Sequence, residues 1–233
     1  VYDPSPVDTE AGFLYSYDCT ADGVWELMDS SDAIFACTYD DDGEYTVRGR
    51  VSDKDGASNE YTRTVVVENV APTADFVNNS GTIFEGQSAT LAFTNLTDPS
   101  QDDLEDGLLF SYDCTDDGTW EAVNIPAATY ACAYPDNGIF TVLGRATDKD
   151  GGFTEYRVSV MVNNVAPLVG PISAPLDPMQ VGTAIVTRAD FTDPGILDTH
   201  TATWAWGDGT STYGLVTESS GSGFVIGSHA YNL

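Results

Sequence analysis

Two acidic loops of identical sequence hold the residues of this chain that are best suited to chemistry. Both read Asp-Lys-Asp-Gly, and they span residues 53–56 and 148–151. Each loop offers two carboxylates two residues apart on a glycine turn, a spacing that lets both face one hard cation such as Ca²⁺, which takes roughly six to eight oxygen ligands. The same residues also suit a tight hairpin turn, in which Asp and Gly are chosen for backbone conformation alone. The loops therefore predict either a calcium site or an ordinary turn.

Other carboxylates are placed to complete such a site. The Asp-Pro pairs at residues 3–4 and 98–99 would each add one donor if their loop lies at the same end of the domain, with Glu85 or Asp113 assisting. Backbone carbonyls and water would fill the remaining positions around the ion. We therefore predict Ca²⁺ as a structural cofactor. The predicted metal ligands are Asp3, Asp53, Asp55, Asp98, Asp148 and Asp150.

The four cysteines form two pairs with the same spacing. Cys19 and Cys37 are 18 residues apart, as are Cys114 and Cys132, which is unlike the closely spaced pairs of zinc sites. We interpret them as intradomain disulfides, each worth about 3 kcal/mol in the chain-entropy model. Such bonds predict an oxidising compartment, and hence a secreted or cell-surface protein. Buried free thiols in a reducing compartment are the alternative.

The net charge of the chain limits the classes of partner that we expect it to bind. There are 37 acidic residues against 8 basic ones, a net charge of -29, and 27 of the acids are Asp. Such a surface repels the phosphates of nucleic acids and of anionic lipids, so we expect neither as a partner. No apolar run approaches the roughly 18 residues of a spanning helix, so no membrane insertion is predicted for this segment. Divalent cations are the natural partner, although excess Asp also keeps a crowded polymer soluble or marks a salty habitat.

Catalytic motifs do not emerge from the sequence. The two histidines, His200 and His229, stand in no metal-protease or triad spacing, and there is no G-x-S-x-G elbow or glycine-rich phosphate loop. Each cysteine has a predicted partner, which leaves no free thiol as a nucleophile. Among so many acids, nothing singles out a pair for glycoside cleavage. We therefore predict that this segment is not an enzyme.

A repeat of 95 residues organises these features. One offset carries Cys19 to Cys114 and one Asp-Lys-Asp-Gly loop to the other, and it carries Asp3-Pro4 to residues 98–99 and then to residues 193–194. We predict three domains, residues 1–71, 72–166 and 167–233, of which only the second is complete. The first lacks its opening strands and the third its closing ones, so we interpret the chain as a window cut from a longer polypeptide.

The third copy differs at the cysteine positions. Alignment places Trp206 at the first of them and His229 at the second, so both cysteines are replaced together. This joint loss is expected if the two cysteines of the other copies bond to each other.

Hydrophobic periodicity predicts strands through most of the chain. Residues 45–51, 61–67 and 156–162 alternate apolar and polar side chains, and Asp-Gly or Asn-Gly turn signals recur at short spacing. About seven such strands in 95 residues predict an all-β chain of tandem immunoglobulin-like β-sandwiches. The junctions at residues 68–72 and 163–167 are short and contain proline, which favours a stiff connection.

The third copy resembles the PKD domain family. Residues 204–210 (Trp-Ala-Trp-Gly-Asp-Gly-Thr) followed by residues 229–231 (His-Ala-Tyr) are similar to its hallmark W-D-F-G-D-G turn and H-x-Y. Residues 39–47 and 134–142 resemble the P-G-x-Y-x-V hairpin of the family, and residues 83–91 its opening. The first two copies depart from the hallmark, with Tyr-Asp-Cys-Thr in place of Trp-Asp-Phe-Gly.

The resemblance implies an extracellular spacer or adhesion module without catalytic activity. We predict a structural or adhesive repeat region that forms a stiff, calcium-stabilised shaft of a cell-surface, filament or matrix protein. Its expected partners are other copies of the same protein or cell-surface and matrix components. The alternative is a spacer or substrate-binding accessory region of a secreted depolymerase. A further hypothesis is that neighbouring chains complete each other's sandwiches by donating strands.

Overall fold

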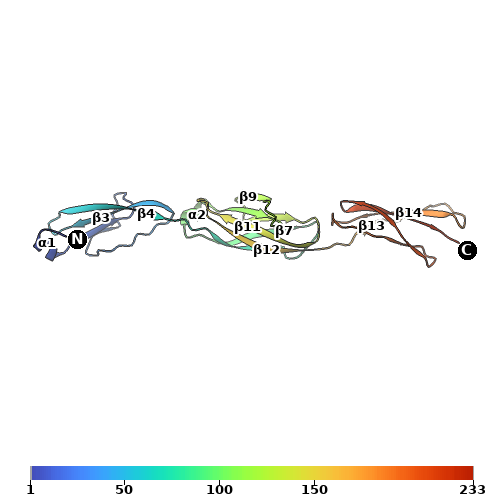
Figure 1. Cartoon of the computed structure of the whole chain (residues 1–233), viewed down its shortest axis with the longest axis horizontal. Helices are drawn as coiled ribbons and strands as arrows, with labels where there is room; N and C mark the ends of the chain where they lie inside the picture. The colour runs from blue at the N-terminus through green and yellow to red at the C-terminus, as the bar shows by residue number, and fades with distance from the viewer. Residues whose placement is uncertain (1, 233) are drawn as a thin grey trace. The chain divides into compact units, whose positions relative to one another are not determined.

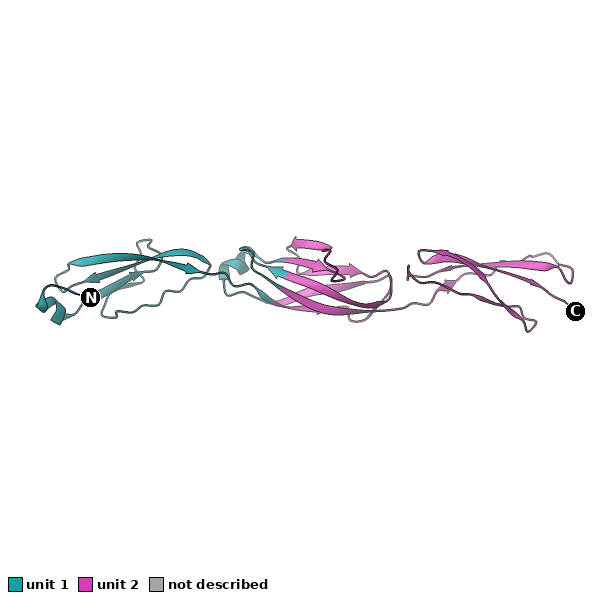
Figure 2. Ribbon diagram, viewed as in Figure 1, with its two compact units in different colours: residues 1–73, 96–109, 146–154 teal, residues 74–95, 110–145, 155–233 magenta. Residues whose placement is uncertain are grey.

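The computed structural model describes residues 2–232, so the predicted domain ends at residues 1 and 233 lie outside the described residues. The chain is all-β, as predicted, apart from two helices of six residues. It divides into two compact units, residues 1–73 with 96–109 and 146–154, and residues 74–95, 110–145 and 155–233 (Figure 2). Within residues 2–232, neither helix has the length and apolar character needed to cross a membrane.

The first predicted repeat holds one antiparallel sheet in the order β2-β1-β3-β4. The long hairpin of β3 and β4 pairs in continuous register from Gly43 opposite Val67 to Ser52 opposite Ser58. The alternating segments at 45–51 and 61–67 lie in these two strands. The elements are α1 (Pro6–Ala11), β1 (Leu14–Asp18), β2 (Leu27–Ser30), β3 (Gly43–Ser52) and β4 (Ser58–Val67).

The second predicted repeat contains two sheets, of order β10-β7-β5 and β6-β12-β11-β8-β9 (Figure 1). The pairing of β6 with β12 is parallel. The elements are β5 (Thr73–Asn78), β6 (Ile83–Phe84), β7 (Ser88–Thr97), α2 (Gln101–Asp106), β8 (Leu109–Asp113), β9 (Ala122–Ile125), β10 (Thr129–Ala133), β11 (Gly138–Thr147) and β12 (Phe153–Asn163).

Aromatic rings from both sheets fill the core of the second repeat. Phe93 stacks on Phe76 with ring centroids 4.6 Å apart and on Phe110 at 5.0 Å. Gly144 makes room for them, because a Cβ there would lie 2.7 Å from the Cζ atoms of both Phe76 and Phe93. Interlocking side chains from two facing sheets are the packing of a β-sandwich.

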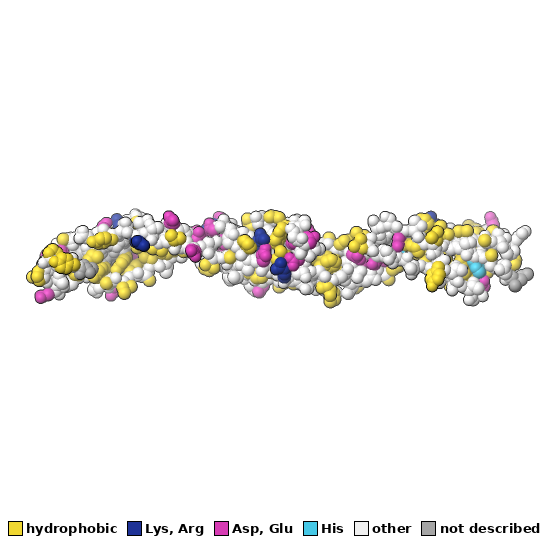
Figure 3. Space-filling view, in the orientation of Figure 1, with side chains coloured by type: hydrophobic (Ala, Val, Ile, Leu, Met, Phe, Trp, Pro, Cys, Tyr) yellow, Lys and Arg dark blue, Asp and Glu magenta, His cyan; other side chains and the backbone are white. Residues whose placement is uncertain are grey.

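Over residues 2–71, the first repeat shows one sheet and no second layer. Tyr15, Tyr17, Gly49 and Tyr61 line an open groove at the positions of Phe110, Tyr112, Gly144 and Tyr156 in the second repeat. Tyr61 is 69% exposed. Hydrophobic side chains gather on the surface of this repeat at the left of Figure 3. In the second repeat, rings from β5 and β7 cover the corresponding face.

The third predicted repeat holds a sheet of order β13-β14-β18-β17 and a hairpin of β15 and β16. Trp204 and Trp206 are buried against Ala189 and Val225. The ring of Trp204 lies over Gly227, where a Cβ would be only 2.4 Å from its Cδ1. The elements are β13 (Leu168–Val169), β14 (Ala184–Thr192), β15 (Thr203–Ala205), β16 (Ser211–Tyr213), β17 (Leu215–Ser219) and β18 (Ser222–Ala230). Each sheet draws its strands from a single predicted repeat, and the repeat boundaries themselves stay predictions.

Candidate metal centre

The Asp-Lys-Asp-Gly loops use one carboxylate oxygen to close a turn. Asp148 Oδ1 accepts hydrogen bonds from the backbone N–H groups of Asp150 at 3.0 Å and Gly152 at 2.7 Å. Gly151 takes the left-handed conformation that this turn requires, with φ +88°. Asp53 caps its own loop in the same way, at 2.8 and 2.9 Å. One oxygen of each first aspartate therefore stays available for another partner.

The Asp-Pro loop of the second repeat, residues 98–107, brings two more carboxylates to the same place. Asp98 Oδ1 accepts from the backbone N–H of Ser100 at 2.9 Å. Ser100 is the N-cap of α2, and its hydroxyl accepts from the backbone N–H of Asp103 at 3.1 Å. These bonds satisfy free N–H groups at the start of the helix and fix the direction of its first turn. The carboxylate of Asp103 lies within 4.8 Å of that of Asp98.

Asp98, Asp103 and Asp148 form a three-carboxylate cluster within the first compact unit. Each offers one oxygen, and these oxygens all lie within 4.8 Å of one another. Two oxygens bound to one Ca²⁺ at about 2.4 Å each lie at most about 4.8 Å apart, so this spacing suits a shared ion. The side chain of Asp103 is fully buried, and neither of its oxygens accepts a hydrogen bond. Burial raises the pKa of the Asp103 carboxyl.

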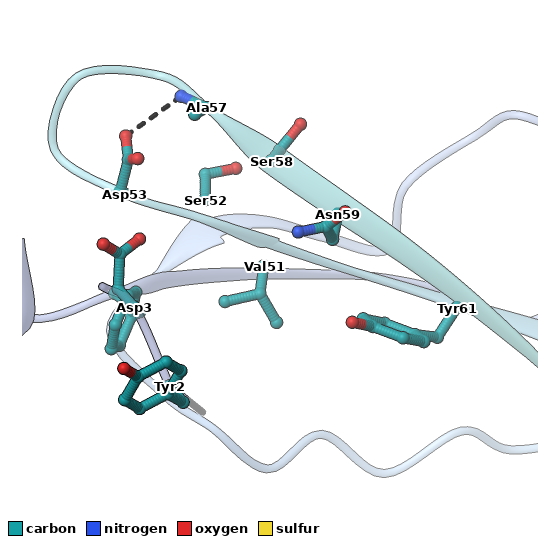
Figure 4. Close-up of a pocket in the computed structure, with 10 residues that line it drawn as sticks. Tyr2, Asp3, Val51, Ser52, Asp53, Ala57, Ser58, Asn59 and Tyr61 are labelled. Carbon is teal, nitrogen blue, oxygen red and sulfur yellow. Dashed lines mark hydrogen bonds between the residues drawn. The ribbon is translucent and has the colours of Figure 1, made fainter. Parts of the chain in front are cut away.

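The first repeat contains an equivalent cluster, Asp3, Asp8 and Asp53, with oxygens within the same 4.8 Å limit. Figure 4 shows the carboxylates of Asp3 and Asp53 on the same side of a cavity that Val51 and Tyr61 also line. Asp3 Oδ1 accepts from the backbone N–H of its own loop, at Ser5, as Asp98 does. The geometry of the site is therefore a property of the repeat.

A lysine ammonium lies among neighbouring carboxylates in the first unit. Lys149 Nζ is 2.7 Å from Asp41 Oδ2 and 3.1 Å from Asp103 Oδ1, and it also pairs with Asp150. The hydrogen bonds from Lys149 lower the pKa of both Asp41 and Asp150. In the first repeat, Lys54 pairs with Asp8 at 2.9 Å and lowers the pKa of that carboxyl. The lysine of the loop thus supplies an internal cation to the carboxylates around it.

The structure separates the two carboxylates of each loop. Asp148 belongs to the cluster with Asp98 and Asp103, whereas Asp150 faces Asp41 and Lys149. Asp55 pairs with Lys54, has a side chain 67% exposed, and belongs to none of the carboxylate clusters of the described residues. The cause is the turn itself, because the first aspartate turns one oxygen inward to cap the backbone of the second.

Among the predicted metal ligands, Asp3 meets Asp53, and Asp98 meets Asp148. Sequence reasoning missed Asp8 and Asp103, although the 95-residue offset relates them and continues to Asp198. Asp113 lies elsewhere, where Oδ2 accepts from the backbone N–H of Gly118 at 2.8 Å. Glu85 belongs to a different cluster, in the second unit.

The cysteines are joined in two disulfides. Cys19 bonds to Cys37 and Cys114 to Cys132, with Cα atoms 5.7 and 5.6 Å apart. At the matching place in the third repeat, Trp206 stacks on His229 with ring centroids 4.8 Å apart. A tyrosine hydroxyl donates to the carbonyl oxygen of the first partner in all three repeats. The donors are Tyr39, Tyr134 and Tyr231, at 3.2, 3.1 and 2.8 Å.

In the third repeat, a histidine stands beside the aspartate that is equivalent to Asp98. Asp193, equivalent to Asp98, accepts from the backbone N–H of Gly195 at 2.8 Å through Oδ1. Its other oxygen faces His200 Nε2 at 3.1 Å, and His200 Nδ1 lies 2.6 Å from Glu218 Oε2. The bond to Asp193 raises the pKa of His200. A protonated imidazole can therefore neutralise Asp193 without any ion.

Comparisons with known proteins assign no family. No protein-family model matches the chain, and no curated protein matches its sequence. Among solved structures, the amphioxus IgVJ-C2 molecule aligns with TM-score 0.37 and 15% identity over 69% of this chain and 92% of that one. The Dpr2 Ig1–Ig2 structure, in complex with DIP-Theta Ig1–Ig3, gives 0.34 and 12% over 95% and 80%. The protocadherin GammaB4 extracellular domain gives 0.32 and 14% over 95% and 36%. At such low scores these likenesses assign no function.

Proposed function

We propose that this chain is a non-enzymatic, extracellular region of PKD-like β-sandwich repeats, which serves as a calcium-stabilised shaft in a cell-surface, filament or matrix protein. The observation that carries the proposal is the buried carboxylate of Asp103, whose Oδ2 has no partner while Asp98 and Asp148 converge on the same point. A buried carboxylate is costly unless cations compensate it. Lys149 Nζ lies 3.1 Å from Asp103 Oδ1, but Asp41 and Asp150 share this one ammonium.

The position of the cluster explains why an ion would serve a structural role. Asp98 and Asp103 belong to the Asp-Pro loop, and Asp148 belongs to the hairpin between β11 and β12. Asn69, from the segment that joins the first two repeats, donates to Asp148 Oδ2 at 2.9 Å. An ion held there would fix two loops and the linker together, and would offset the mutual repulsion of carboxylates in a chain of net charge -29.

The disulfides support the extracellular setting, because such bonds persist in oxidising compartments. The carboxylates described above cap turns or face a cation, and we propose that none of them serves a reaction. Other copies of the protein or components of a cell surface or matrix are the proposed partners.

Thermal unfolding of the whole chain under non-reducing conditions tests the proposal. Added Ca²⁺ is expected to raise the unfolding temperature by several degrees over excess chelator, because an ion at a hundred times its dissociation constant stabilises the folded state by about 2.7 kcal/mol. Asp103→Asn should remove the part of this response that the cluster of Asp98, Asp103 and Asp148 contributes. It should be no less stable than wild type in chelator, because the buried charge is gone while Lys149 keeps its ion pairs with Asp41 and Asp150.

Asp106→Asn is the matched control, since it removes one charge from an exposed position of the same helix. It should keep the full calcium response. An identical unfolding temperature for wild type in Ca²⁺ and in chelator would show that the Asp-Lys-Asp-Gly loops are ordinary turns.

A further inference from the structure

Three carboxylates meet in the second compact unit, at residues that belong to none of the sites above. They are Glu85, directly after β6, Asp136, on the turn between β10 and β11, and Asp198, on the loop after β14. Each offers one oxygen, and the three oxygens lie within 4.8 Å of one another. This distance lets one ion touch all three.

Glu85 is the most informative member. It is 2% exposed, and its Oε1 accepts from the backbone N–H of Val165 at 2.6 Å. Its Oε2 is buried and has no hydrogen-bond partner. An ionised carboxylate oxygen that is taken out of water and left without a donor is costly unless a cation lies nearby.

Gly195 shows where that oxygen points. A Cβ built on Gly195 would lie 2.8 Å from Glu85 Oε2 and 2.7 Å from Asp198 Oδ2. Two carboxylates from different loops therefore converge over the same α-carbon, and any side chain there would displace them. The glycine keeps open a space that these two oxygens border.

Backbone contacts hold the three loops in place. Ile196 N–H donates to the carbonyl oxygen of Pro135 at 3.1 Å, and Gly86 N–H donates to that of Tyr134 at 2.8 Å. The loops carrying Glu85, Asp136 and Asp198 are thus tied to one another next to the carboxylates themselves. A site assembled on such contacts is preorganised.

Protein side chains do not supply the cation. Within the described residues, no Lys, Arg or His forms an ion pair with Glu85, Asp136 or Asp198. The contrast is with Asp41 and Asp103, which the 95-residue offset relates to Asp136 and Asp198 and which share Lys149. We propose that Glu85, Asp136 and Asp198 bind a calcium ion that joins the second predicted repeat to the third. All the donors are hard oxygens, which suit Ca²⁺ and not a soft metal.

This inference extends the proposed function to a second site and can fail independently of it. The test is the number of Ca²⁺ ions bound per chelator-stripped chain, measured by equilibrium dialysis. Glu85→Gln and Asp198→Asn are each expected to lose one ion. Gly195→Ala should lose the same ion, because its methyl group fills the space between the two carboxylates.

Asp177→Asn is the matched control, since it removes an exposed charge from the same unit and should lose no ion. Glu85→Gln keeps an oxygen for the Val165 N–H, and circular dichroism verifies that each variant is folded. Should Glu85→Gln distort the chain, ion binding by the Asp198→Asn variant decides the question, because Asp198 is partly exposed.

The two sites are separated by comparing variants. Loss of an ion in Asp103→Asn, with wild-type binding in Glu85→Gln and Asp198→Asn, overturns this inference alone. Loss in Glu85→Gln with wild-type binding in Asp103→Asn supports it and overturns the cluster of the second repeat. A wild-type chain that binds no Ca²⁺ overturns both.

Discussion

The second and third repeats place different chemistry at equivalent positions. Asp98 of the second repeat leaves one oxygen toward Asp103 and Asp148, whereas Asp193 of the third directs the same oxygen to His200. Asp103 has the ammonium of Lys149 at 3.1 Å, whereas its equivalent Asp198 has Glu85 and Asp136 beside it. Where the second repeat has a disulfide, the third has a stacked tryptophan and histidine.

The difference shows that the fold of the repeat determines where carboxylates come together. It does not determine which cation neutralises them. The capping of the Asp-Pro loop by its first aspartate recurs at Asp3, Asp98 and Asp193. The second oxygen of that aspartate is not needed for the turn. A lysine ammonium, a protonated imidazole or a bound metal ion can therefore neutralise this second oxygen.

The largest expected effect comes from removing the internal cation. Lys149→Met leaves Asp41, Asp103 and Asp150 without an ammonium, so these carboxylates come to resemble the cluster around Glu85. In chelator, we expect the variant to unfold at a distinctly lower temperature than wild type. Added Ca²⁺ should restore most of the lost unfolding temperature. Unfolding followed over a calcium titration measures both quantities. A loss that calcium does not restore would mean that the lysine and an ion are not interchangeable there.

Removing the disulfide of the second repeat should have the next largest effect on stability. The double substitution Cys114→Ala with Cys132→Ala opens a loop of 18 residues and should cost about 3 kcal/mol. The loss should be confined to the second repeat, because the third is held by Trp206 and His229. Hydrogen exchange resolved by segment tests this through peptides from 72–166 and 167–233. Equal loss of protection in both segments would contradict the local role of the bond.

Low pH should lower the stability of the third repeat through Asp208, which titrates, whereas a disulfide does not titrate. The Thr210 hydroxyl, with help from His229, lowers the pKa of Asp208 to about 2. Asp208 in the unfolded chain titrates near its ordinary value of about 3.9. Its contribution to stability is therefore complete above that value and is lost as the pH falls through about 2.

The effect should be small, because the side chain of Asp208 is 33% exposed. When the pH is lowered from about 5 to about 2, the unfolding temperature of wild type should fall slightly more than that of Asp208→Asn. Equal losses in the two proteins would show that the ionised Asp208 carboxylate, with its bonds to Thr210 and His229, adds no stability in solution.

The sequence predicts the strands because their signal is local. The alternating segments at 45–51, 61–67 and 156–162 lie in β3, β4 and β12, and the all-β prediction is confirmed. One face of each strand is apolar whatever lies opposite, so period-two alternation survives without knowledge of the partner strand.

The sites were harder to predict because they depend on contacts between distant loops. In the sequence, Asp103 is one of several acidic residues in a short segment. Only the 95-residue offset, which relates it to Asp8 and Asp198, distinguishes it from the others. Nothing local links Glu85 to Asp136, which come together only after β6 and β10 have found their places in the sandwich. The two acids of each Asp-Lys-Asp-Gly loop look like one site in sequence, and turn capping divides them in space.

The position of each disulfide also determines how the chain would lengthen under tension. Each bond spans 18 residues, which a pulling force cannot extend while the bond is intact. At about 3.4 Å per residue, each bridged repeat withholds roughly 60 Å of contour length. The third repeat has no covalent bond at the same positions, where Trp206 stacks on His229, so it has no such reserve. A stretched molecule should therefore release its repeats in unequal steps, whose lengths record which ones are covalently bridged.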